Sequence, residues 1–246
     1  MPPIPSHFDF YLTTMADWPA SFFIDLGLAA HAPLPGLVQR LHVTASLKRP
    51  RADGMRDRLE AEELHAMEDA VTRQVDRLGG RYVGRITWQG RSDAVFYLPG
   101  TVEDLSAVED ATGDYQVSLR MESDPEWRFY REFLMPNPYQ HQTMLNRRVL
   151  AALAEQGDDG TTPREVDHVF LCHTPTPLQQ LAGALATRGF RCDPLGRSEN
   201  GEHMLQAHRD EAPAFPRMDE VAAEIFQAMP SGVSYDGWGC GVVPRA

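Results

Sequence analysis

The sequence predicts an α+β protein made of two tandem ferredoxin-like domains, each with helices on one face of an antiparallel sheet. Strand-like and helix-like segments follow the order β-α-β-β-α-β twice along the chain, with two extra leading strands in the first domain. The segment Pro136-Asn137-Pro138 interrupts this pattern between the two series. We therefore expect two domains, at residues 1–136 and 137–246.

The strands of the first domain are indicated by alternating polarity. Leu41, Val43 and Ala45 alternate with His42 and Thr44, which is the period of a strand with one face in water. Similar reasoning places the other strands at about 8–13, 20–26, 82–88, 93–98 and 115–121.

Two helices are expected between these strands. Apolar residues recur at helical spacing at Leu64, Met67, Val71, Val75 and Leu78. Gly79-Gly80 can end that helix, and a shorter helix is expected at about 102–108.

The second domain begins with a helix that has a strong start signal. Asn137 is a good N-cap, Pro138 suits the first helical position and Gln140 can complete a capping box. We expect this helix to end near Gly157. A strand at 166–173, a helix capped by Thr176, strands at 190–195 and 202–208, a helix at 218–229 and a strand at 233–242 complete the second series.

Near the carboxyl end, Tyr235-Asp236-Gly237-Trp238-Gly239 places two large aromatic residues around an expected Asp-Gly turn. Tyr and Trp each carry an apolar ring with one polar atom that needs a partner. The string is therefore either a structural aromatic corner or an exposed lip that binds another protein.

Composition favours a protein partner over nucleic acid. The 246 residues include 35 acidic and 23 basic side chains, for a net charge of -12, and both halves are acidic. Because a phosphate backbone would be repelled, we expect no direct nucleic-acid binding. The widely spaced Cys172, Cys192 and Cys240, with no visible signal peptide or membrane span, predict free thiols and a cytoplasmic location.

The candidate catalytic and metal motifs are weak. Glu62-x-x-His65 and Glu165-x-x-His168 superficially resemble di-iron motifs, but the second lies at a strand entry, where residues three apart point to opposite faces. We interpret Glu62, His65 and Asp69 as a solvated helix face, and His168 as a hydrogen-bonded core residue. We expect no metal ion, no cofactor and no catalytic residue.

Two further groups have a structural and a functional interpretation. Asp158, Asp159, Glu165 and Asp167 cluster near one loop, and form either a charged surface or a dock for a basic partner. The aromatic and basic residues of 127–131 suit a buried interdomain hinge better than a surface on which RNA bases stack.

Several strings together resemble known families. The segment from about Asn146 to Val243 is similar to the ribonuclease E regulator B family, through Asn146-Arg147-Arg148-Val149-Leu150, Gly157-Asp158-Asp159-Gly160, Pro163-Arg164-Glu165-Val166-Asp167-His168 and the aromatic string at 235–239. The first half looks like the bacterial domain of unknown function 695, through Phe22-Phe23-Ile24-Asp25-Leu26-Gly27, Tyr82-Val83-Gly84-Arg85-Ile86-Thr87 and Asp124-Pro125-Glu126-Trp127-Arg128-Phe129-Tyr130.

The resemblance implies a non-enzymatic regulator that binds ribonuclease E or its scaffold region and modulates RNA turnover. It brings no activity for the first domain and leaves the oligomeric state open. The alternative is an enzyme of unknown chemistry with a small-molecule site between the domains. The residues expected to contact the partner are Asp158, Asp159, Glu165, Asp167, Tyr235, Asp236 and Trp238.

Overall fold

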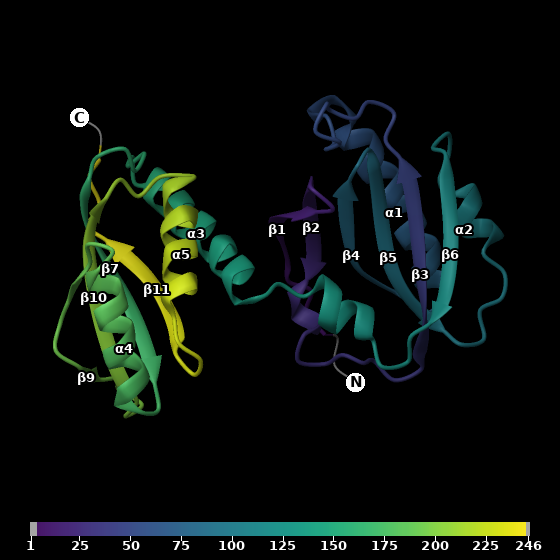
Figure 1. The fold of residues 1–246 in the computed structure, drawn as a ribbon. Coiled ribbons are helices and arrows are strands. Elements are labelled where there is room, and N and C mark those ends of the chain that lie inside the picture. The colour runs from purple at the N-terminus through teal and green to yellow at the C-terminus, as the bar shows by residue number, and fades with distance from the viewer. Residues whose placement is uncertain (1–3, 245–246) are drawn as a thin grey trace. The chain divides into compact units, whose positions relative to one another are not determined.

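The computed structural model describes residues 4–244, which form two compact units (Figure 1). The boundary between the units falls between Pro136 and Asn137 in the sequence. Each unit combines helices with an antiparallel sheet, which confirms the mixture of helices and antiparallel strands predicted from the sequence.

The sheet of the first unit has six strands in the order β1-β2-β4-β5-β3-β6, and every neighbouring pair is antiparallel. The strands are β1 Phe8–Met15, β2 Trp18–Asp25, β3 Leu37–Ser46, β4 Arg81–Trp88, β5 Arg91–Pro99 and β6 Val117–Ser123.

One face of this sheet is covered by α1 (Ala61–Arg77) and α2 (Ser106–Asp110). The short 3₁₀ helix η1 (Leu26–Leu28) lies between β2 and β3, and the 3₁₀ helix η2 (Arg58–Glu60) directly precedes α1. Leu41 and Phe96 on the strands pack with Val71 and Val75 of α1 in a fully buried cluster. The helical spacing of the apolar residues in α1 therefore serves the core of this unit.

The opposite face is covered as well, so the expectation of helices on one face is wrong for this unit. Trp127 stacks on Tyr97 with ring centroids 4.0 Å apart and donates its Nε1–H to the Leu37 carbonyl at 2.7 Å. In the π-helix η3 (Phe129–Leu134), the Tyr130 hydroxyl donates to the Asp25 carbonyl at 2.7 Å. These aromatics are buried inside the first unit, and the predicted interdomain hinge is therefore also wrong.

The second unit has a sheet with the strand order β11-β7-β10-β8, and β9 pairs with β10. The strands are β7 Arg164–Cys172, β8 Arg191–Cys192, β9 Gly196–Arg197, β10 His203–Glu211 and β11 Ser234–Cys240. The helices are α3 Pro138–Glu155, α4 Pro175–Ala186 and α5 Arg217–Ala228.

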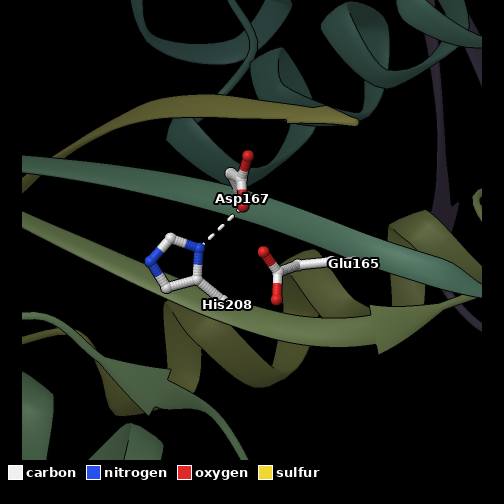
Figure 2. A group of neighbouring side chains, drawn as sticks. All are labelled: Glu165, Asp167 and His208. Carbon is white, nitrogen blue, oxygen red and sulfur yellow. Dashed lines mark hydrogen bonds and ion pairs between the residues drawn. The ribbon is translucent and has the colours of Figure 1, made fainter. Parts of the chain in front are cut away.

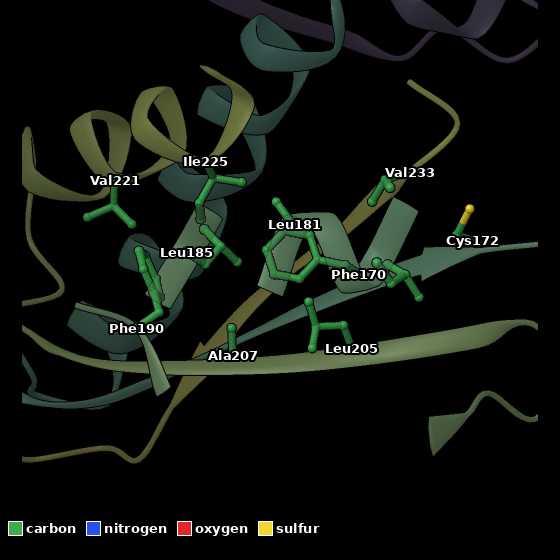
Figure 3. Packing of buried hydrophobic residues seen from close by; sticks show 11 residues of the cluster. Phe170, Cys172, Leu181, Leu185, Phe190, Leu205, Ala207, Val221, Ile225 and Val233 are labelled. Carbon is green, nitrogen blue, oxygen red and sulfur yellow. The ribbon is translucent and has the colours of Figure 1, made fainter. Parts of the chain in front are cut away.

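The two faces of this sheet differ in what covers them. On the inner face, Phe170, Leu205 and Ala207 meet Leu181 and Leu185 of α4 and Ile225 of α5 (Figure 3). The other face, called the outer face below, carries the alternate residues of β7 and β10 that pair in register: Glu165 with Asp210, Asp167 with His208, Val169 with Gln206 and Leu171 with Met204. Among the residues that the structure describes, no helix packs on the outer face.

The Asp-Gly pair near the carboxyl end is a β-bulge inside β11, which corrects the predicted turn. Tyr235 lies opposite Phe170, Gly237 lies opposite Val169, and Asp236 is the extra residue. Gly237 has a φ of 123°, which suits glycine. The extra residue shifts the alternation, so Tyr235 and Trp238, three positions apart, both face the inner side of the sheet.

The side-chain amide of Asn146 joins three elements of the second unit. Its Nδ2 donates to the Asp219 carboxylate at 2.7 Å and to the Met218 carbonyl at 3.2 Å, both at the start of α5. Its Oδ1 accepts from Trp238 Nε1 at 2.7 Å and from Gln142 Nε2 at 2.9 Å. Asn146 is fully buried, and these four bonds use its whole hydrogen-bonding capacity.

His168 is a buried, hydrogen-bonded core histidine, as predicted. Its Nδ1 lies 2.7 Å from the Tyr235 hydroxyl, and its side chain is fully buried. Burial, reinforced by the nearby positive charge of Arg209, lowers the pKa of His168 to about 4. Its Nε2 has no hydrogen-bond partner within 4–244 that would stabilise the charged ring.

We expect Asn146→Ala to lower the free energy of unfolding of the second unit by about 3 kcal/mol, because the partly buried Trp238 N–H and Asp219 carboxylate lose their partner. Urea titration followed by NMR signals of this unit measures the change. Glu155→Ala, an exposed change on the same helix, should cost less than about 0.5 kcal/mol. Equal costs for the two variants would contradict a connecting role for Asn146.

The second unit should lose stability as the pH falls from about 6.5 to about 4. In that window the unfolded chain binds a proton at His168 and the folded chain does not, so the free energy of unfolding rises with pH by up to about 3 kcal/mol. Urea midpoints measured across this range should show a shallower slope for His168→Gln. His173→Gln, whose side chain is 91% exposed, should keep the wild-type slope, and a steep slope in His168→Gln would refute the assignment.

Candidate functional site

The carboxylate of Asp158 is buried and bonds to other segments of the second unit, so it is not accessible to a partner. Its Oδ1 accepts from the Gly160 N–H at 2.9 Å, and its Oδ2 accepts from the Val243 N–H at 2.8 Å and from Arg164 Nη2 at 2.5 Å. These donors, the Val243 N–H first, keep the pKa of Asp158 below its ordinary value. The carboxylate thus links the loop after α3 to β7 and to the segment after β11.

Asp159, the next residue, has a different environment. Its side chain is exposed, and its Oδ1 accepts from the backbone N–H and the hydroxyl of Thr161 at 3.0 and 2.7 Å. Two neighbouring aspartates that look equivalent in the sequence therefore differ in accessibility.

Glu165, Asp167 and His208 lie together on the outer face, as Figure 2 shows. Asp167 Oδ1 lies 2.7 Å from His208 Nδ1, and Asp193 Oδ2 lies 3.1 Å from His208 Nε2. Arg191, opposite His208 on β8, bonds to Glu165. The hydrogen bond to Asp167, with a smaller contribution from Asp193, raises the pKa of His208 above its ordinary value.

Within residues 4–244, these side chains form the one cluster with the ligand spacing of a metal site. One potential ligand atom from each of Glu165, Asp167 and His208 lies within 4.8 Å of the others. However, both ring nitrogens of His208 already contact carboxylates, and Glu165 and Asp167 are exposed. A cation would have to displace those contacts, and the arrangement serves as an ion-pair network.

The polar atoms of Tyr235 and Trp238 form hydrogen bonds within the second unit and thereby stabilise its fold. The Tyr235 hydroxyl bonds to His168, and the Trp238 Nε1–H donates to Asn146. Burial raises the pKa of Tyr235. Asp236, the bulged residue between them, is exposed.

The structure separates the seven predicted contact residues into two groups. Asp158, Tyr235 and Trp238 bond to the interior, and the exposed carboxylates are Asp159, Glu165, Asp167 and Asp236.

The sequence did not indicate that His208, Asp193 and Arg191 lie beside Glu165 and Asp167. They approach Glu165 and Asp167 only through the pairing of β7, β10 and β8. Strand register was therefore the missing information.

Beside these charges, the outer face carries an apolar strip. Val169, Leu171 and Met204 are only partly buried and adjoin the acidic end of β7. A partly apolar surface with charges at one end is typical of a transient protein interface. Throughout the described chain, each helix is too short or too polar to cross a lipid bilayer.

Comparisons with known proteins agree with this two-part organisation. The model of a family of unknown function, DUF695, matches residues 7–135, and the model named regulator of ribonuclease activity B matches residues 143–240. The order and arrangement are those predicted from the sequence. A search of curated proteins found no match.

Two solved structures are similar at low identity. One is an unknown protein from Galdieria sulphuraria, 14% identical, covering 81% of this chain and 96% of that chain with a TM-score of 0.22. The other is described as a proposed glycine cleavage system transcriptional repressor, 10% identical, covering 83% and 99% with a TM-score of 0.22. At these TM-scores neither structure informs the fold or the function.

The assignment of this chain to a family therefore rests on the family models. The DUF695 match spans more than half of the 246 residues. The chain belongs to the DUF695 family of unknown function through residues 7–135, and residues 143–240 match the model named regulator of ribonuclease activity B.

Proposed function

We propose that this protein is a non-enzymatic regulator that binds ribonuclease E, or its scaffold region, through residues 137–246 and thereby modulates RNA turnover. The match to regulator of ribonuclease activity B supports a role in regulating a ribonuclease. Neither the comparisons nor the described residues favour the alternative of an enzyme with an interdomain site. The three free thiols suit the reducing cytoplasm, where we place this activity.

The fold proposal is that residues 1–136 and 137–246 are two domains with ferredoxin-like sheets. The orders β4-β5-β3-β6 and β11-β7-β10-β8 support it. In each of these orders, the strands that come first and third along the chain lie in the centre of the sheet, and the fourth strand lies beside the first. This is the strand arrangement of a β-α-β-β-α-β unit. Strands β1 and β2 extend the first sheet beyond β4.

The outer face of the second sheet is the proposed docking surface. The main support for this surface is the difference between the two faces of the sheet. Helices α4 and α5 pack on the inner face, whereas the outer face has partly buried apolar residues next to carboxylates. An uncovered sheet face of this kind can accept a partner.

Charge determines the kind of partner. Glu165 and Asp167 present exposed carboxylates at one end of the outer face, and the chain as a whole carries a net charge of -12. Both features favour a basic segment of the partner and a faster encounter with it. Asp159 and Asp236 are exposed and belong to the same proposal, whereas Asp158, Tyr235 and Trp238 act by holding the loop and β11 in place.

The test is binding of the full chain to purified ribonuclease E, preceded by capture from the native host. The double variant Glu165→Lys with Asp167→Lys should raise the Kd by at least about tenfold, because like charges then oppose a basic partner. Higher ionic strength should weaken wild-type binding, since exposed charges are screened.

The matched control is Glu155→Lys with Glu199→Lys. It changes the net charge equally at exposed positions of the same unit, at the end of α3 and in the turn before β10. Equal Kd values for the two double variants would exclude the outer face as the contact. Failure of the wild-type chain to bind ribonuclease E would remove the proposed partner.

A further inference from the structure

The first unit contains a pocket of about 630 Å³ between α1 and the strands β1, β2 and β4. This volume is within the range of small-molecule sites. His65 and Asp69 of α1 line it at its open side, and both side chains are exposed, as expected for a solvated helix face.

Aromatic side chains form one wall of the pocket. The Phe8 ring stacks on Phe23 and on Tyr82, with centroids 5.1 and 5.6 Å apart. Phe8 and Phe10 nevertheless remain 36% and 39% exposed. Large apolar rings facing a hollow supply the area that an apolar ligand would cover.

Most of the charge in the pocket is internally neutralised. Glu68 is buried and accepts hydrogen bonds from Arg85 Nη1 at 2.5 Å and from the Tyr82 hydroxyl. The Arg85 guanidinium also lies over the Phe23 ring at 5.2 Å. Asp69 is exposed on the rim, where water screens its charge.

Arg56 is different, because its partner is a neutral group. Its Nη1 lies 2.8 Å from His65 Nε2, and a guanidinium can only donate, so this ring nitrogen must be unprotonated. Burial, together with the positive charges of Arg85 and Arg56, lowers the pKa of His65. Arg56 is half-buried and forms no ion pair with a carboxylate in the described part of the chain.

A second hollow of about 350 Å³ adjoins the first and shares Ser21, Arg56 and Arg85 with it. The additional arginine there, Arg51, is paired with Asp53 at 2.7 Å. Arg56 therefore stands where the two hollows meet, as a half-buried cation that no carboxylate of the described residues contacts directly, although Glu68 and Glu60 attract it from further away. Such a group has much to gain from an anion.

We propose that the amino-terminal unit binds a small organic carboxylate, with its charged group on Arg56 and its apolar body against Phe8, Phe10 and Phe23. The planar guanidinium matches the two oxygens of a carboxylate, and the aromatic wall removes the apolar body from water. This site lies in the DUF695 region and does not depend on the proposed ribonuclease partner.

Calorimetry on the full chain with three probes tests the site: 3-phenylpropionate, its uncharged amide and inorganic phosphate. The acid should bind at least about tenfold tighter than the amide, because only the acid forms a charge-assisted pair with Arg56. Phosphate alone should bind more weakly than the acid, since it lacks the apolar body. Phosphate binding as tight as that of the acid would overturn the aromatic part of the site.

Two variants locate the binding. Arg56→Gln should abolish the preference for acid over amide, whereas Arg58→Gln, an exposed arginine two residues further on, should leave it unchanged. Phe10→Ser should weaken acid and amide by the same factor. No saturable binding of the acid up to about 10 mM, or equal effects of Arg56→Gln and Arg58→Gln, would overturn the proposal.

Discussion

The second unit depends on one buried amide. Asn146 accepts from Trp238 of β11 and donates to the first turn of α5, so a helix, a second helix and an edge strand meet at a single side chain. A buried amide without partners would cost more free energy of folding than its hydrogen bonds contribute. The side chains around Asn146 therefore have one low-energy arrangement. Because Trp238 is held inward, the bulge at Asp236 is fixed as well, and the outer face keeps its small and polar surface along β11.

The helices and strands of this protein could be predicted where residues close together in the sequence determine them. The capping box of Asn137 and Gln140 forms as expected, because both partners are three residues apart on the same turn. Alternation located β3 and β6, and helical spacing located α1. The predicted cap of α4 at Thr176 is wrong: Thr174 precedes Pro175 and occupies the cap without a side-chain bond, whereas Thr176 lies within the helix. Pro at the first position set the boundary there.

What sequence reasoning could not supply is pairing between distant segments. Nothing near Asp158 distinguishes it from Asp159, and only the return of Arg164 and Val243 to its carboxylate makes it internal. Likewise helical periodicity correctly leaves His65 exposed on α1, but it gives no sign that a loop nine residues earlier in the chain brings Arg56 to its ring. Side chains that receive their partners from other elements change role without any change in the local pattern.

The bulge in β11 also bears on how the molecule behaves at high concentration. β11 is the outermost strand of its sheet, and an outermost strand has a row of backbone groups that another chain can extend. The additional residue at Asp236 breaks the regular spacing of that row and places a negative charge there. The same irregularity that orients two aromatic rings therefore also guards this edge against self-association into extended sheets.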